Sequence, residues 1–397
     1  MKKMDNKPKP PPFSSLSFDK QFLIKLNQKI IKCSKNTIAT ASKVIEALLS
    51  QDKKKILSLA ENGLPDDLPM LRAYIWKIML NYLPVDIERW DEVLKQKRAQ
   101  YDGYKKLIEV KLAKEKKDKN YKSRDTLEQI IKDVYRTGAQ LSFFFHPTNN
   151  AKILDQEEAI KMFERRKNCT FKDINEIYYD EKENETHADV LKRILFIYTV
   201  FCADISYHQG MNELLAPIYY CYSYDKTYTD ESEENIEADA FWSFQNLMSK
   251  VSLSFVSAND LGLQIKGFIY EKCLAFVDEE LYNHLINAGV KNEYYCYRWF
   301  ILLFSQEFEI NDILKLWDLV FTHEDIYYYI VYIAMAYVIN KKEIFMKQGM
   351  VEIMQELQNF ENVNVGELIK KAKEIRNENK EDLDEFILKT TQIPNEQ

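Results

Sequence analysis

The stretch TLEQIIKDVYRT, residues 126–137, repeats its apolar residues at the spacing of an α-helix. At about 100° per residue, four apolar side chains fall within a stripe that is about 100° wide, which is typical of a helix with one face on a core. They are Leu127, Ile130, Ile131 and Val134. The stretch therefore predicts an amphipathic helix.

Arg136 lies on the opposite side of this helix, roughly 180° from Leu127 by the same step, so we expect its side chain to be exposed. Asp133 lies three residues earlier, within reach for a charge-assisted hydrogen bond to the guanidinium. An ordinary solvated arginine paired with an ordinary aspartate would give the same pattern. The stretch alone leaves both interpretations open.

A second stretch, ISYHQGMNELLAP at 205–217, joins a polar loop to an apolar helix. Gln209 stands in the loop, and Gly210 removes a side chain, which would allow another backbone to approach closely. Pro217 predicts a break or kink in the helix that follows. The alternative is that Gln209 only satisfies loop backbone groups and that Gly210 only serves the turn.

A guanidinium and a carboxamide are the two groups that hydrolysis of a phosphoanhydride needs from outside the nucleotide site. One neutralises developing charge and the other orients water. Neither Arg136 nor Gln209 is a nucleophile or a general base. The pair therefore predicts a protein that lends residues to another protein's active site.

The composition favours an all-α fold with no nucleotide site of its own. The chain has 397 residues, of which 46% are apolar and only nine are glycine, too few for most turn-rich β folds. Long apolar helical runs continue nearly to residue 340, and neither GxGxxG nor GxxxxGK[ST] occurs. We expect no cofactor and no metal site.

Charge and cysteine usage narrow the class of partner. A formal charge of −7 argues against nucleic acid, and no run of about eighteen apolar residues predicts a transmembrane segment. The N-terminus does not resemble a secretory signal. The cysteines are scattered without CxxC or zinc spacing, so we expect a cytoplasmic protein with ordinary buried thiols: Cys33, Cys169, Cys202, Cys221, Cys273 and Cys296.

Composition also divides the chain into segments. We expect a disordered Pro/Lys-rich N-terminus (1–17), an N-terminal helical extension (18–60), a main domain (61–340) and a C-terminal helical tail (341–397). Within the main domain we expect three insertions. They are a basic tract (105–124), predicted as a solvated helix face or loop, a polar stretch (146–187) and an acidic exposed linker (223–239).

Four ordered blocks over residues 61–340 resemble the TBC (Tre-2/Bub2/Cdc16) domain of Rab GTPase-activating proteins. The entry block holds Gly63, Pro65, Leu71, Arg72 and Trp76; the arginine-finger block Ile130, Asp133 and Arg136; the glutamine-finger block Tyr207, Gln209, Gly210 and Met211; and the last block Trp299, Trp317 and Asp318. Ala73 and Asn81 depart from the family, which often has glycine there. The insertion at 146–187 absorbs a long spacing between the fingers, which resembles the TBC1D13-type branch.

The resemblance implies a two-lobed helical domain that binds a GTP-loaded Rab in a groove between the lobes. Arg136 would stabilise the transition state and Gln209 would position water, with Asp133, Tyr207 and Gly210 supporting the fingers. GTP and Mg²⁺ would be bound by the Rab. Hydrolysis of that GTP would regulate vesicle trafficking, and the chain would reach endomembranes through the Rab. A catalytically weak Rab-binding scaffold is the alternative.

The tryptophans of these blocks have a simpler assignment. We expect Trp76, Trp299 and Trp317 to pack in the core, and His208 to be a surface or packing residue without a metal.

Overall fold

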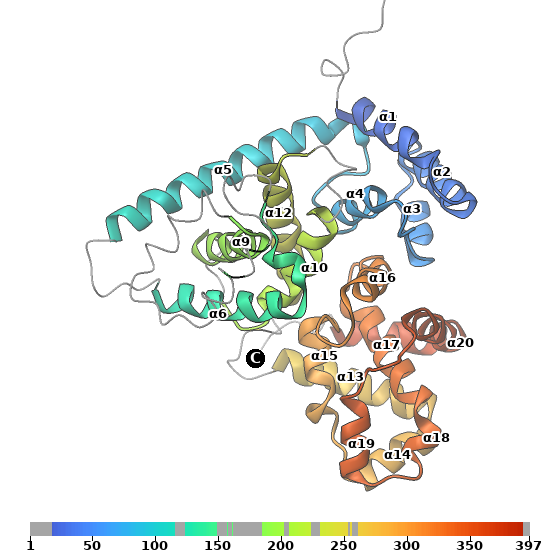
Figure 1. Ribbon diagram of the computed structural model, residues 1–397. Helices are drawn as coiled ribbons and strands as arrows, with labels where there is room; N and C mark the ends of the chain where they lie inside the picture. Colours follow the sequence, from blue (N-terminus) through green and yellow to red (C-terminus); the bar gives the residue numbers. More distant parts are fainter. Residues whose placement is uncertain are drawn as a thin grey trace, which may run out of the picture.

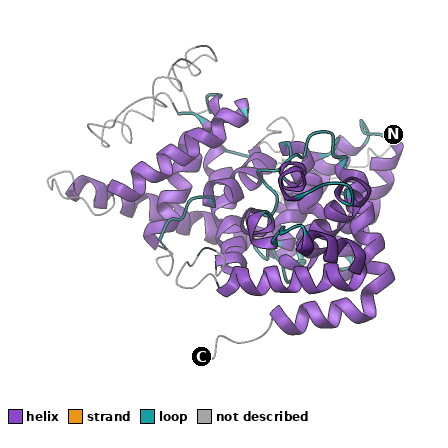
Figure 2. Cartoon of the chain, turned by 90° about the horizontal axis from the view of Figure 1, so that it is seen from below, coloured by secondary structure: helices purple, strands orange, loops and turns teal. Residues whose placement is uncertain are grey.

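The computed structural model describes residues 18–115, 124–148, 185–201, 206–223, 231–252 and 261–391, together with the single positions 157, 161 and 255. These residues form helices and loops in two lobes, with α16 at their junction (Figure 1). Figure 2 shows the same chain from below, with no strand among the described residues. One isolated β-bridge joins Pro147 and Thr186. The predicted all-α, two-lobed class is confirmed.

The first lobe holds the helices from residue 18 to residue 251. They are α1 (Phe18–Ile30), α2 (Lys35–Leu49), α3 (Lys53–Glu61), α4 (Pro69–Met79), α5 (Trp90–Glu115), α6 (Arg124–Gln140), α9 (His187–Phe201), α10 (Met211–Ser223) and α12 (Glu233–Val251). Two short 3-10 helices, η2 (Ile87–Arg89) and η3 (Ser142–Phe145), lie between them.

The second lobe holds the remaining helices. They are α13 (Leu261–Val277), α14 (Glu279–Asn287), α15 (Cys296–Leu302), α16 (Ile310–Val320), α17 (Tyr327–Asn340), α18 (Lys342–Phe345), α19 (Met350–Leu357) and α20 (Val365–Thr391), with η6 (Asn292–Tyr294) before α15. The described part of the predicted tail, up to Thr391, holds α18, α19 and α20, and its longest element, α20, packs against α17 and α13.

Each lobe is built around one largely apolar helix that is buried on all sides. Every side chain of α10 is buried, and α10 packs against α12, α6, α9 and α4. In α17 the side chains from Tyr327 to Val338 are all buried. A helix that is apolar all round must lie inside a fold. Pro217 does not end α10, which continues to Ser223, so of the predicted break or kink the break is absent.

Asp318 on α16 joins the second lobe to the entry block of the first. Its buried carboxylate accepts hydrogen bonds from Arg72 Nε at 3.0 Å, Trp76 Nε1 at 2.8 Å and the backbone N–H of Leu64 at 3.0 Å. Two sequence blocks about 250 residues apart therefore meet in one network. The predicted core tryptophans Trp76, Trp299 and Trp317 are all buried.

The prediction that the acidic stretch 223–239 is an exposed linker is wrong for its second half. Residues 224–230 lie outside the described part, but α12 begins at Glu233. Asp239 on this helix is buried and accepts from Lys77 at 2.6 Å and from Arg98 at 2.9 Å. Burial alone would raise the pKa of Asp239, but these two cations outweigh burial and lower it to about 2. Basic side chains that are distant in the sequence therefore neutralise this acidic residue and allow it to be buried.

Several predicted segments fall partly or wholly outside the described residues. These are 1–17, most of 146–187 and the part of the basic tract from 116 to 123; the tract is helical up to Glu115, where α5 ends. The domain boundaries stay a prediction. None of the helices in the described ranges combines the length and the apolar composition that a membrane span requires.

Candidate functional site

Arg136 projects from α6 into solvent, on the face opposite the core. The four predicted stripe residues of this helix are buried, whereas the Arg136 side chain is 64% exposed. Its Nη1 donates to Asp133 Oδ1 at 3.1 Å. The predicted exposure and the predicted pairing are both confirmed, because both follow from the geometry of a single helix.

Asp133 is a buried hub that connects α6 to the glutamine loop. Besides Arg136, its carboxylate accepts from Gln129 Nε2 at 2.9 Å and from the Tyr207 hydroxyl at 3.1 Å. Burial, reinforced by Asp133, raises the pKa of Tyr207, so this hydroxyl stays protonated as a donor. The negative charge of Asp133 thus holds the arginine and the loop tyrosine together.

Gln209 is exposed in the turn before α10, and Gly210 explains how that turn is made. Gly210 has φ +104°, a conformation that residues with a Cβ rarely adopt. A Cβ built there would lie 2.7 Å from Leu302 Cδ2. We expected another backbone at this position, but the group that approaches is a leucine side chain from α15 of the second lobe.

Three residues that the sequence analysis missed tie the two finger elements together. Asn212 Oδ1 accepts from the Gly210 backbone N–H at 3.1 Å, and its Nδ2 donates to Thr137 Oγ1 at 2.7 Å. Thr137 donates in turn to Glu213 Oε1 at 2.8 Å. Thr137, which follows Arg136 on α6, is therefore bonded to the first turn of α10, the helix that follows Gln209. Polar residues inside the otherwise apolar run MNELLAP were the available signal.

Glu213 carries a carboxylate in an unusual environment. Burial raises its pKa, although hydrogen bonds from Thr137, Gln306 and Asn212 partly counter that effect. Glu213 also lines the cavity that Arg136 and Gln209 border.

A cavity of about 440 Å³ is lined by both predicted finger residues, Arg136 and Gln209. Asp133 and Gly210 line it from the first lobe, and Arg298 and Gln306 from the second. A neighbouring groove of about 1090 Å³ shares Arg298 with it and extends along the loops next to α16 and α19. The site therefore lies between the lobes and opens into a larger groove.

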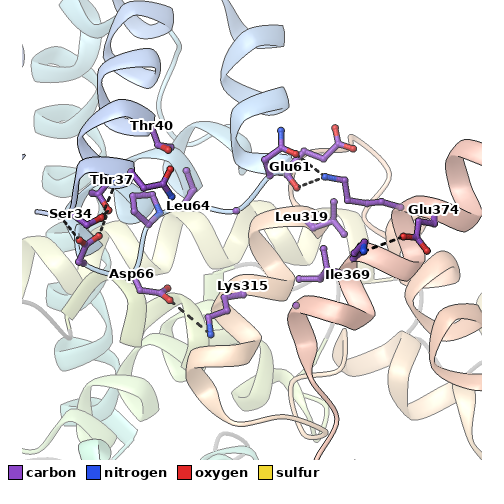
Figure 3. Close-up of a pocket in the computed structure, with 18 of the residues that line it drawn as sticks. Ser34, Thr37, Thr40, Glu61, Leu64, Asp66, Lys315, Leu319, Ile369 and Glu374 are labelled. Carbon is purple, nitrogen blue, oxygen red and sulfur yellow. Dashed lines mark hydrogen bonds and ion pairs between the residues drawn. The ribbon is translucent and has the colours of Figure 1, made fainter. Parts of the chain in front are cut away.

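Another crevice, of about 790 Å³, lies between α2, α3, α16 and α20 (Figure 3). Across it, Lys315 lies 3.9 Å from Asp66, and Lys373 donates to the backbone carbonyl oxygen of Glu61 at 3.2 Å. Its lining includes neither Arg136 nor Gln209. The finger cavity is the stronger candidate.

The described residues offer no cluster of three or more His, Cys, Asp or Glu that could hold a metal. His208 is half-buried, with its ring 6.5 Å from that of Phe255, as expected for a packing residue. The described cysteines are free thiols, three of them buried and Cys33 partly so, while Cys169 and Cys202 lie outside the described residues.

The chain is similar to known proteins over most of its length. A model of the Rab-GTPase-TBC domain family matches residues 148–345, a segment that contains Gln209 and begins after Arg136. Human TBC1 domain family member 13 is 28% identical over 377 residues, covering 81% of this chain and 94% of that protein. The GTPase-activating protein gyp7 of Schizosaccharomyces pombe is 26% identical over 285 residues, covering 70% of this chain and 33% of that protein.

Among solved structures, the crystal structure of the Ypt/Rab-GAP domain of Gyp1p superposes with a TM-score of 0.63 at 20% identity. The match covers 86% of this chain and 98% of that domain. The two chains therefore share a fold.

Proposed function

The chain belongs to the Rab-GTPase-TBC domain family, and we propose that it activates GTP hydrolysis by a Rab-family small GTPase. One observation carries the proposal: Arg136 and Gln209, 73 positions apart (209 − 136), line one cavity between the lobes. A protein that only binds a GTPase has no need to bring a guanidinium and a carboxamide together.

Arg136 is the transition-state stabiliser in this mechanism. Its guanidinium is largely exposed and has a single hydrogen bond to Asp133, so it is free to reach a phosphate outside the chain. In the γ-phosphoryl transfer step, negative charge spreads over the oxygens of the transferring group, and an arginine finger neutralises it. For Ras and Gα such a finger accelerates hydrolysis by about 10³–10⁵.

Gln209 positions the attacking water in trans. A carboxamide accepts and donates hydrogen bonds at once, so it holds a water in line with the bond that breaks. The hydrogen bond from the Gly210 N–H to Asn212 holds the turn at Gly210, and this turn fixes the backbone position from which the Gln209 side chain extends. The hydrogen bonds of Asp133 to Arg136 and to Tyr207 hold α6 next to the loop that carries Gln209.

This chain supplies no nucleophile and needs no cofactor in this mechanism. GTP and Mg²⁺ are bound by the Rab, water is the nucleophile, and the chain acts on a partner's chemistry. We propose that it reaches endomembranes through the membrane-bound Rab and regulates vesicle trafficking there.

The test is single-turnover GTP hydrolysis by a complete panel of purified Rab proteins, each loaded with GTP, with and without this chain. We expect at least one Rab to hydrolyse GTP faster by a factor of about 10³ or more. If one or more Rabs bind the chain but none hydrolyses GTP faster, the chain is a scaffold. If none binds, a Rab-directed function is wrong.

A further inference from the structure

A second arginine lines the finger cavity from the opposite lobe. Arg298 belongs to α15, and it borders both the cavity that holds Arg136 and Gln209 and the larger neighbouring groove. Any group that Arg136 and Gln209 reach from one side therefore lies close to Arg298 on the other. The mechanism above gives Arg298 no role.

The guanidinium of Arg298 is held rigidly by a buried carboxylate. Nε donates to Glu307 Oε1 at 2.6 Å, and Nη2 donates to Glu307 Oε2 at 2.8 Å. The Glu307 side chain is 3% exposed, whereas the Arg298 side chain is 49% exposed. A guanidinium has five N–H donors in a fixed plane, and these two bonds fix that plane while leaving donors on the open side.

This geometry differs from that of the finger arginine. Arg136 has one hydrogen bond, at 3.1 Å, to a carboxylate three residues away on its own helix, whereas Arg298 has two shorter parallel bonds. Arg136 is suited to move when charge develops. Arg298 cannot leave Glu307 without stranding a buried carboxylate. A donor on an anionic oxygen whose charge stays the same during hydrolysis contributes equally to the ground state and the transition state, so it lowers KM and leaves kcat unchanged.

We propose that Arg298 is an anchoring residue that binds an anionic oxygen of the GTP-loaded GTPase, and that Glu307 is its positioning residue. The proposal rests on the proposed function above. The anionic oxygen belongs either to a carboxylate of the GTPase or to a phosphate of its nucleotide. Guanidinium groups bind both by paired hydrogen bonds, and the test below separates the two sources.

The test compares variants on a GTPase that the wild-type chain activates. For Arg298→Ala we expect KM to rise about tenfold and kcat to change by less than about threefold. Affinity for the GTPase loaded with a non-hydrolysable GTP analogue should fall by the same factor. Arg298→Lys should rescue only in part, since an ammonium cannot form the parallel pair of bonds. Glu307→Gln should raise KM with Arg298 still present.

Two controls separate anchoring from a purely structural role. Lys342→Ala removes another cation, on α18, whose side chain is 31% exposed. Lys342 pairs with Asp278 at 2.9 Å and does not line the cavity, so KM should stay unchanged. Urea denaturation checks that each variant is folded. If Arg298→Ala loses stability but keeps wild-type KM and affinity, or if its kcat falls as far as that of Arg136→Ala, the anchoring role is wrong.

Acidic residues of the GTPase are then substituted one at a time. A substitution that abolishes the effect of Arg298→Ala identifies a carboxylate partner, whereas the absence of coupling to all of them identifies the phosphate. If the wild-type chain activates no GTPase, the proposed function is wrong and this inference is wrong with it. A wild-type chain that activates a GTPase whose KM is insensitive to Arg298→Ala overturns only the inference.

Discussion

Asp318→Asn should destabilise the fold strongly, because it removes a charge at the junction of the two lobes. The substitution keeps the shape of the side chain but replaces one acceptor oxygen by an NH₂ group that faces donors. Arg72, Trp76 and the Leu64 backbone all donate to this carboxylate, and Arg72 is itself only 3% exposed. Breaking one side of a buried ion pair costs about 3–5 kcal/mol. Because asparagine still accepts one bond, we expect about 3 kcal/mol.

The matched control is Asp66→Asn, which removes the other carboxylate bonded to Arg72. Asp66 lies 2.8 Å from Arg72 Nη2, but its side chain is 62% exposed. A solvated carboxylate of this kind contributes below about 1 kcal/mol. Urea denaturation followed by tryptophan fluorescence suits both variants, since Trp76 donates to Asp318 and its ring centroid lies 6.0 Å from that of Trp317. Equal, small losses in the two variants would refute the reasoning.

Three further predictions concern the finger turn and acid stability. Gly210→Ala should cost about 1–2 kcal/mol, because a Cβ at φ +104° is strained and meets Leu302; an unchanged denaturation midpoint contradicts this. Tyr207→Phe removes the hydroxyl that donates to Asp133, so stimulated hydrolysis should fall by less than about tenfold; a loss as large as that caused by removing the finger arginine would give the hydroxyl a catalytic role. Acid should destabilise the chain as Asp239 is protonated. Its folded pKa of about 2 lies below the value of the unfolded chain, so its contribution of about 2 kcal/mol is present above pH 4 and lost between about pH 4 and pH 2; urea midpoints that stay constant over this window would show that Asp239 contributes nothing.

The sequence predicted those features that depend on one helix. The stripe of α6, the exposure of Arg136 and its pairing with Asp133 all follow from the 3.6-residue period, so no tertiary information was needed. The all-α class follows in the same way from apolar helical runs and few glycines. The meeting of Arg136 and Gln209 in one cavity came instead from the family resemblance, and the cavity geometry agrees with it.

The features that the sequence did not predict depend on contacts between distant elements. Thr137 bonds to Glu213, 76 residues later, and Leu302 reaches Gly210 from the other lobe. Periodicity gives no information about such pairs. The acidic start of α12 was predicted as a solvated linker because charge runs are usually exposed, but bases on α4 and α5 neutralise Asp239 inside the lobe. Local composition thus predicted the wrong environment.

The most direct test of residue donation is single-turnover GTP hydrolysis by a responsive Rab with the variants Arg136→Ala and Gln209→Ala. Lys132→Ala is the matched control, since it removes another exposed cation of α6 that does not line the cavity. We expect each finger variant to lose most of the acceleration, by a factor of about 10²–10³ or more, while the control keeps it and all three denature like the wild-type chain. Full acceleration by both finger variants would contradict the dual-finger mechanism.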